Sequence, residues 1–249
     1  LFDSASLTKV VATTTLAMIL HDTQRLSLDT PISTYLDGFI GPDKAGICIK
    51  HLLTHTSGIA EELMHFTPHM TQDDVWHTML NYPLHASPGT EFRYTCTNMI
   101  LLARIIEIIT QKSFSECFTT MVAQPLGLTH TRFNPPDRLS CAPTRAQSPR
   151  GEIIQGVVND DRAFMLGGIA GNAGSFETAK DLETFMIMMM NGGKTRDGHQ
   201  LINTSTINSW TSSQCPFDRG FGWEIGRHLS ATAFGHFGWT GTSIWADKE

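Results

Sequence analysis

The sequence predicts a mixed α/β or α+β fold, and three observations support this class. Segments with a helical spacing of apolar residues come first, short segments with strand character and more helix follow, and no internal repeat or low-complexity tract interrupts them. The chain has 249 residues, 41% hydrophobic and 17% charged, which is typical of a globular protein. Its length allows one large domain or two small ones with a sizeable core.

The predicted helices have recognisable ends. In chain order, helices are expected over residues 6–21, 51–55, 71–80, 98–110, 113–123 and 178–190. Asp3 or Ser4 can cap the first helix, and Asp73 and Asp74 suit the positive end of the third helix dipole. The last helix meets an Asn-Gly-Gly stop at 191–193.

Strand signals lie towards the C-terminus. Apolar residues alternate over 220–226, and 242–246 is a short β-like segment. The stretch 133–150 is rich in proline, arginine and serine, so it is expected to be a long surface loop.

Charge, hydropathy and cysteine content exclude several classes of protein. The net charge of -6 and the pI of about 6.0 give no basic footprint for nucleic acid. The longest apolar stretch, 99–109, contains Arg104 and Glu107 and is too short to cross a bilayer. The five scattered cysteines form no Cys-x-x-Cys pair, which makes a disulfide framework improbable and favours a reducing compartment.

Two histidine pairs and a glycine cluster are candidate binding sites. His51 with His55 and His65 with His69 have helical metal spacing, but neither pair has a glutamate or an obvious third ligand. Ring nitrogens bonded to backbone are therefore the preferred interpretation. The glycine cluster 167–174 lacks dinucleotide spacing and is expected to form a tight turn, and the chain contains no phosphate-loop or Gly-x-Ser-x-Gly motif.

The Ser-x-x-Lys at residues 6–9 is the remaining chemical signal. Three residues of helix place the Ser6 hydroxyl and the Lys9 ammonium on one face. Ser6 also lies in the first turn, where free N–H groups favour developing negative charge. Lysine can activate a serine as a base only if its pKa falls towards neutrality. The motif alone is weak, since a surface Ser/Lys pair has the same spacing.

Four segments in fixed order raise its significance. They are FDSASLTK (2–9), HLLTHTSG (51–58), PGTEFRY (88–94) and GHFGWTGT (235–242), and the segment 167–182 adds a fifth. Together they strongly resemble the serine β-lactamase and penicillin-binding protein superfamily, nearest to its branch of class C β-lactamases, DD-peptidases and family VIII esterases.

The resemblance implies a β-lactamase/transpeptidase-like fold, with an antiparallel sheet flanked by helices and an all-helical lobe. It implies a single catalytic domain over 1–249, with a mainly helical lobe at roughly 30–150 and an α/β lobe from 1–29 and 151–249. Family members carry strands before the nucleophile helix and a strand and helix after the Lys/His-x-Gly strand. The domain is therefore expected to be incomplete at both ends, and its compartment stays open.

The resemblance also implies catalytic roles. Ser6 would be the acylated nucleophile and Lys9 its proton acceptor. Tyr94 would pass a proton to the leaving group and then activate the deacylating water, provided that Lys9 and His236 lower the pKa of its phenol.

Substrate-binding roles follow in the same way. His236 would border the site and, when protonated, hold a substrate carboxylate. The N–H groups of Ser6 and Trp239 would form an oxyanion hole, and Gly238 would let the backbone approach a ligand.

Two positions depart from the family pattern. Cys96 stands where the Tyr-x-Asn element has asparagine, and a thiol substitutes poorly for an amide that bonds an acylamide. Histidine instead of lysine at position 236 weakens permanent carboxylate binding, because its ordinary pKa is about 6.5. Both changes leave room for ester or amide substrates with other side chains.

The expected function is a serine hydrolase acting on a β-lactam, a D-alanyl peptide or a small ester, without metal or organic cofactor. The partner would be a small-molecule or peptidoglycan-derived substrate. Two alternatives stay open: a carboxylesterase of the family VIII type, and a non-catalytic module that binds penicillin or peptidoglycan.

Overall fold

The computed structural model describes residues 1–39, 41, 43–61, 70–148, 150–226 and 229–249. Its helices are η1 (Lys9–Thr14), α1 (Thr15–Asp22), η2 (Ile32–Thr34), α2 (Ile49–Leu53), α3 (Gln72–Leu80), α4 (Cys96–Thr110), α5 (Phe114–Phe118), η3 (Thr119–Ala123), α6 (Gln124–Leu126), η4 (Arg138–Ser140), α7 (Asp161–Met165), α8 (Ala179–Met190) and α9 (Thr204–Trp210). Its strands are β1 (Phe2–Asp3), β2 (Arg132–Phe133), β3 (Pro143–Ser148), β4 (Gly151–Gln155), β5 (Ser175–Glu177), β6 (Glu224–Ile225), β7 (Phe234–Phe237) and β8 (Ser243–Ala246).

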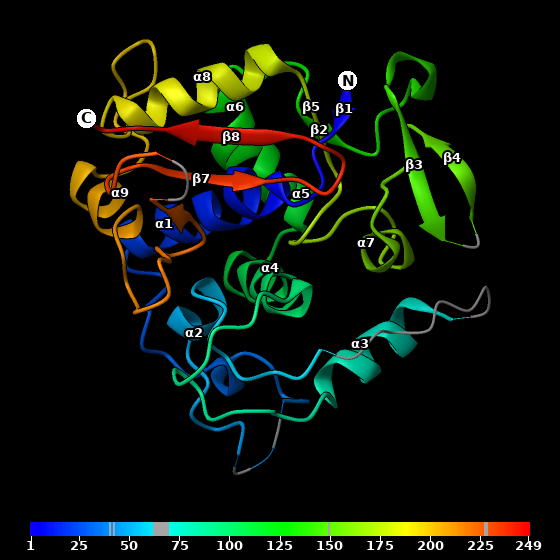
Figure 1. The fold of residues 1–249 in the computed structure, drawn as a ribbon, viewed down its shortest axis with the longest axis vertical. Coiled ribbons are helices and arrows are strands. Elements are labelled where there is room, and N and C mark those ends of the chain that lie inside the picture. The colour runs from blue at the N-terminus through cyan, green and yellow to red at the C-terminus, as the bar shows by residue number, and fades with distance from the viewer. Residues whose placement is uncertain (40, 42, 62–69, 149, 227–228) are drawn as a thin grey trace.

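Antiparallel strands form the sheet region at the top of Figure 1. One sheet has the order β6-β7-β8, and a second has the order β1-β5-β2 with β5 in the middle. Phe2 pairs with Glu177 across β1 and β5, and His236 pairs with Ile244 across β7 and β8. The N-terminal segment thus supplies β1 of the second sheet, and the turn after β7 ends near this strand.

The helix that follows Ser6 runs through the core of the molecule. Every residue of η1 is buried, and η1 is a π-helical segment that continues into α1. On the other side of the β6-β7-β8 sheet, α8 covers β8 (Figure 1). Trp223 fills the layer between them, because its ring stacks on Phe185 of α8 at 6.3 Å and meets Phe234 of β7 edge-on at 5.1 Å.

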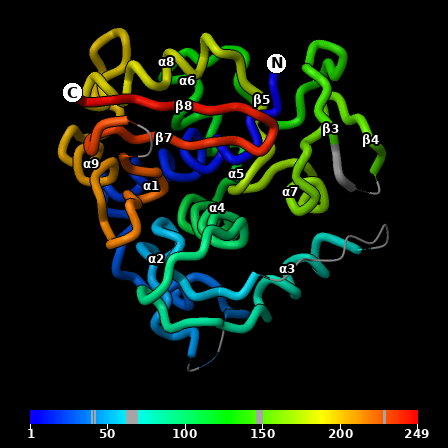
Figure 2. The backbone as a smooth tube through the Cα atoms, viewed as in Figure 1, coloured from blue at the N-terminus to red at the C-terminus, as the bar shows by residue number. Residues whose placement is uncertain are grey.

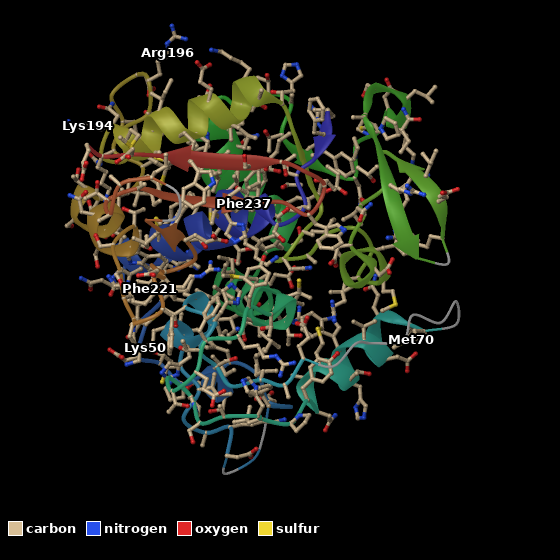
Figure 3. The ribbon with its side chains drawn as sticks, viewed as in Figure 1. Lys50, Met70, Lys194, Arg196, Phe221 and Phe237 are labelled. Carbon is tan, nitrogen blue, oxygen red and sulfur yellow. The ribbon has the colours of Figure 1, made fainter. Side chains whose placement is uncertain are left out.

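Helices and loops make up the opposite end of the molecule. Figure 2 shows α4 between the sheet region and the part that contains α2 and α3. Phe221, labelled in Figure 3, belongs to the sheet side and packs edge-on against Trp210 of α9, with ring centroids 5.3 Å apart. Among the described residues, no helix has both the length and the apolar character that a membrane crossing requires.

The mixed architecture and most of the expected helices are confirmed, with ends shifted by a few residues. Thr71 caps α3 by accepting the Asp74 N–H at 3.2 Å, and Thr178 caps α8 by accepting the Asp181 N–H at 3.1 Å. The first expected helix has no side-chain cap from Ser4, and the Asp3 carboxylate bonds the Ala5 N–H instead.

The long loop expected over 133–150 is wrong. Residues 143–148 form β3, which pairs antiparallel with β4 and has a register shift between Arg145 and Ser148. A hairpin partner satisfies the backbone groups there despite the proline and arginine content. The range 30–150 is mainly helical but also supplies β2 and β3, so the proposed division into lobes stays a prediction.

Candidate active site

The segment before Ser6 holds this residue in a tight turn. Ala5 has φ of +46°, a conformation that non-glycine residues rarely adopt, and its N–H donates to Asp3 Oδ1 at 2.9 Å. Asp3 Oδ2 accepts the Asn159 N–H at 2.6 Å. This carboxylate therefore fixes the turn that presents Ser6, and a residue held in a strained conformation is typical of a functional site.

Lys9 is buried, and its ammonium reaches back to Ser6. Its Nζ donates to Ser6 Oγ at 2.8 Å and to the backbone oxygen of Asn172 at 3.0 Å. The Asn172 side chain donates in turn to Asp160 Oδ1 at 3.0 Å. The glycine-rich segment 167–174 thus forms a turn that holds Lys9, and sequence reasoning missed this role of Asn172 and Asp160.

The protonation state of Lys9 differs from the expectation. Burial acts to lower the pKa of the ammonium, but interactions with the ionised forms of Cys96 and Tyr94, which exist only at high pH, outweigh it and raise the pKa of Lys9 above its usual value. Hydrogen bonds from Nζ to two oxygens favour the charged form as well. The direction is therefore opposite to the one that a base at Lys9 requires, and its role as proton acceptor stays a prediction.

Tyr94 comes from the extended segment before α4 and completes a triad with Ser6 and Lys9. Lys9 Nζ lies 5.0 Å from the centroid of the Tyr94 ring, and interactions of the phenol with Lys9 and Ser6 act to lower its pKa. The residue keeps 38% of its surface exposed, so a substrate can reach it. Burial of the phenol raises the pKa of Tyr94 despite the opposing charge of Lys9, and the expected lowering is wrong.

His236 belongs to β7 and lies beside Tyr94, and its imidazole ring is neutral. Its Nδ1 donates to the Phe237 oxygen at 2.7 Å, and the residue is 1% exposed. Burial and the charge of Lys9 lower the pKa of His236 to about 3. This environment favours a neutral His236, and its role in holding a substrate carboxylate stays a prediction. Its ring instead packs beside Tyr94, with centroids 5.8 Å apart.

Two hydroxyl groups in the turn after β7 donate hydrogen bonds to the segment before Ser6. The Thr240 hydroxyl donates to Asp3 O at 2.6 Å, and the Thr242 hydroxyl donates to Ser4 O at 3.0 Å. A Cβ on Gly238 would lie 2.6 Å from Ser4 O. Gly238 is thus needed for contact with the protein's own backbone, whereas it was expected to serve a ligand. Trp239, 77% exposed, lies in this turn and so comes near Ser6.

Cys96 is the first residue of α4 and half-buried. Burial raises the pKa of its thiol, although the charge of Lys9 opposes this, so the group is neutral. Close by, Arg162 pairs with Glu61 at 3.2 Å, and Glu61 Oε2 also accepts the Thr97 N–H at 2.6 Å. The Cys96 side of the site therefore contains a neutral thiol and a compensated ion pair.

The histidine pairs have structural partners where they are described. His51 Nδ1 accepts the Cys48 N–H at 3.0 Å, and His55 Nδ1 accepts the Thr95 N–H at 3.3 Å, so the preferred interpretation holds for this pair. His65 and His69 lie outside the described residues.

A hollow that the sequence did not reveal adjoins Tyr94. Arg219 lies over two rings, with its guanidinium carbon 4.7 Å from the centroid of Phe92 and 5.8 Å from that of Tyr94. It pairs with Glu224 at 3.4 Å. Phe92, Arg219 and Glu224, together with Phe217, line a hollow of about 640 Å³. Phe92 and Tyr94 stand two residues apart in one of the family-like segments, whereas no motif in the sequence pointed to Arg219 as their neighbour.

Comparison with known proteins agrees with this geometry. The Beta-lactamase family model matches residues 1–249. A protein of Escherichia coli strain K12 named "Putative D-alanyl-D-alanine carboxypeptidase" is 29% identical over 282 residues, which cover 97% of this chain and 65% of that protein. The chain thus spans just under two thirds of the length of this relative.

Solved structures share the fold. A penicillin-binding protein homologue from Caulobacter crescentus superimposes with a TM-score of 0.80 at 22% identity, covering 99% of this chain and 74% of the other. EstCE1, described as a hydrolase with promiscuous acyltransferase activity, gives a TM-score of 0.76 at 22% identity, covering 99% of this chain and 76% of the other. The expected β-lactamase/transpeptidase-like fold and family resemblance are both confirmed.

Proposed function

The chain belongs to the beta-lactamase family, and from this premise we propose that it is a serine hydrolase that forms an acyl-enzyme on Ser6. The observation that carries the proposal is the contact of Lys9 Nζ with Ser6 Oγ at 2.8 Å, with the Tyr94 ring centroid 5.0 Å from the same Nζ. A nucleophile, a fixed cation and a proton-carrying group thus meet at one exposed edge.

Acylation begins with attack of Ser6 Oγ on the substrate carbonyl carbon. The Ser6 proton passes to Tyr94 Oη while the proton of the phenol passes to the leaving oxygen or nitrogen, so Tyr94 ends the step neutral. This relay does not require a phenolate, which agrees with the raised pKa of Tyr94. The Lys9 ammonium stabilises the negative charge that develops on Ser6 Oγ.

Deacylation uses the same groups in reverse order. Water attacks the acyl carbon and gives its proton to Tyr94 Oη, and the phenol returns its proton to Ser6 Oγ as the ester bond breaks. In both steps the N–H groups of Ser6 and Trp239 would stabilise the tetrahedral oxyanion. The bonds from Thr240 and Thr242 to the segment before Ser6 support this arrangement.

The charges around the site bear on the substrate. β-Lactams, D-alanyl peptides and small esters all fit acyl transfer to serine, and the relative named as a carboxypeptidase supports a peptide. The neutral His236 and the Arg219–Glu224 pair support the alternative of a carboxylesterase, because neither supplies an uncompensated cation for a carboxylate. The thiol of Cys96 would face the acyl side chain in place of an amide.

Turnover of p-nitrophenyl butyrate and labelling by a fluorescent penicillin test the proposal. Ser6→Ala should lower ester turnover by about 10³-fold or more and abolish labelling. Ser27→Ala, which changes an exposed serine, is the matched control. Rapid ester turnover without stable labelling indicates an esterase, and stable labelling without turnover indicates a penicillin-binding protein. Equal signals from Ser6→Ala and the wild type would refute the nucleophile.

A further inference from the structure

Tyr94 is held on both sides by one residue, His55, which takes no part in the proposed reaction steps. The Arg93 N–H donates to the His55 backbone oxygen at 2.9 Å, and the Thr95 N–H donates to His55 Nδ1 at 3.3 Å. The two amides that flank Tyr94 in the chain therefore end on the same residue. These bonds fix the direction in which the Tyr94 side chain leaves the backbone.

The His55 ring also lies against the Tyr94 ring. The ring centroids are 4.6 Å apart with an interplanar angle of 38°. His55 is 1% exposed and packs edge-on against Phe92 at 6.4 Å, so its own ring has little freedom. A fixed ring on this face restricts rotation of the phenol away from Ser6.

A second layer of hydrogen bonds determines which His55 nitrogen carries the proton. The Ser57 hydroxyl donates to Asn98 Oδ1 at 2.7 Å, so the Asn98 amide nitrogen is the group 3.3 Å from His55 Nδ1. Nδ1 therefore faces two donors and must be an acceptor, and the ring proton lies on Nε2. Burial lowers the pKa of His55 well below its ordinary value, which keeps Nδ1 free of a proton.

The His55 backbone is in a conformation that costs energy. Its φ of +56° is left-handed, which side chains other than asparagine, aspartate and histidine rarely adopt. A strained residue that bonds a catalytic segment through both its backbone and its side chain is typical of a position kept for function.

We propose that His55 is a positioning residue for Tyr94. It acts by accepting the Thr95 N–H at Nδ1 and by covering one face of the phenol ring. It does not touch Ser6 or the reacting atoms. The role of Tyr94 as proton carrier rests on the proposed function, whereas the effect of His55 on the geometry of Tyr94 can be measured without any substrate.

Two substitutions at position 55 separate positioning from simple folding. Asparagine and glycine both adopt a left-handed φ without strain, but only His55→Asn supplies an oxygen near the place of Nδ1. His51→Asn is the matched control, since His51 accepts the Cys48 N–H in the same sequence motif. Thermal unfolding identifies the temperature range in which all variants are folded.

The first readout is the Tyr94 phenol itself. The chain has three tyrosines, so ¹³Cζ-tyrosine labelling gives three NMR signals, and Tyr94→Phe identifies the one from Tyr94. His55→Gly should shift this signal or broaden it and change its titration with pH, and His55→Asn should largely restore it. A Tyr94 signal and titration unchanged in His55→Gly would overturn the inference, whatever the enzyme does to substrates.

The second readout is the rate of p-nitrophenyl butyrate hydrolysis. His55→Gly should lower kcat by about 10- to 100-fold with little change in KM, because a small displacement of a catalytic group has that effect. His55→Asn should recover most of the loss, and His51→Asn should match the wild type. If His55→Asn is as slow as His55→Gly while folded, the acceptor role is refuted. If the wild type itself is inactive but the NMR contrast holds, only the proposed function fails.

Discussion

The two sides of the active site are built in different ways. Ser6 and Lys9 come from one helix start, and three residues of spacing place the ammonium 2.8 Å from the hydroxyl. Tyr94 enters from a separate segment, and its neighbours His55 and His236 come from two others. A local motif therefore brings Ser6 and Lys9 together, and long-range bonds to Asn172, Thr240 and Thr242 then hold this side. Long-range hydrogen bonds and ring packing alone bring Tyr94 to its neighbours.

Removing the Tyr94 hydroxyl, on the side assembled by long-range contacts, should give the largest loss of activity. Tyr94→Phe keeps the ring that packs between His55 and His236 but cannot carry a proton, so kcat/KM for p-nitrophenyl butyrate should fall by about 10²- to 10⁴-fold. Stopped-flow release of p-nitrophenol measures the loss. Tyr35→Phe is the control, and equal rates in both variants would exclude the proton relay.

Removing the cation tests the locally specified side. Lys9→Met has similar volume and no charge, and kcat/KM should fall by about 10²- to 10³-fold because the charge on Ser6 Oγ loses its stabilisation. The variant should remain folded, since it no longer buries an ammonium. Steady-state kinetics measure kcat/KM, and urea unfolding of the same sample measures its stability. An active Lys9→Met enzyme would contradict the role of the ammonium.

Glu177 is a buried residue of β5, which pairs with the strand that precedes Ser6. Burial raises the pKa of this carboxyl from 4.5 to about 7, partly offset by the Ser4 side chain and by the hydrogen bond that the Ser175 hydroxyl donates to Glu177 Oε1. Below about pH 4.5 the folded and unfolded states are both protonated, and between about pH 4.5 and about 7 only the folded state keeps the proton. The free energy of unfolding should therefore fall by about 3 kcal/mol as the pH rises through this range.

Glu177→Gln should remove that pH-dependent loss. Urea unfolding at pH 5 and at pH 8, with both values at about 25 °C, measures the difference between variant and wild type. Glu183→Gln on the exposed surface of α8 is the matched control. If the wild type and Glu177→Gln lose the same stability between the two pH values, the buried carboxyl does not titrate as described.

His236 should give the smallest effect. Because burial lowers the pKa of His236 to about 3, the residue stays neutral from about pH 5.5 to about 8. The ratio of kcat/KM for a D-alanyl peptide with a free carboxylate to that for its amidated form should therefore not change with pH. A ratio that falls through a single pKa within this range would restore a charged His236.

The contrast between the two sides also explains what the sequence could predict. Helical periodicity and capping residues such as Thr71 and Thr178 are local, so the main helices were predictable. The hairpin of β3 and β4 was missed because proline and arginine favour loops until a partner strand is known. Strands β1, β2 and β5 are three residues long or less, and their pairing joins distant segments.

Within the site, Ser6, Lys9 and Tyr94 could be named from motifs, but their protonation states could not. Burial and neighbouring charges set these states, and both depend on the tertiary structure. The raised pKa values of Lys9 and Tyr94 and the neutral His236 all differ from the conditions that their implied roles require. A ring nitrogen of His55 was expected to bond backbone, and only the geometry shows that this bond is to Thr95, next to Tyr94, and that the two rings pack together.

The location of the acyl group tests the central claim most directly. The protein is mixed with p-nitrophenyl butyrate and, separately, with penicillin, quenched in acid within the first turnover, digested and analysed by mass spectrometry. The account predicts one butyryl or penicilloyl group on Ser6, absent from Ser6→Ala and slower to form in Tyr94→Phe. Substrate turnover with no adduct on Ser6, or an adduct on another residue that persists in Ser6→Ala, would contradict it.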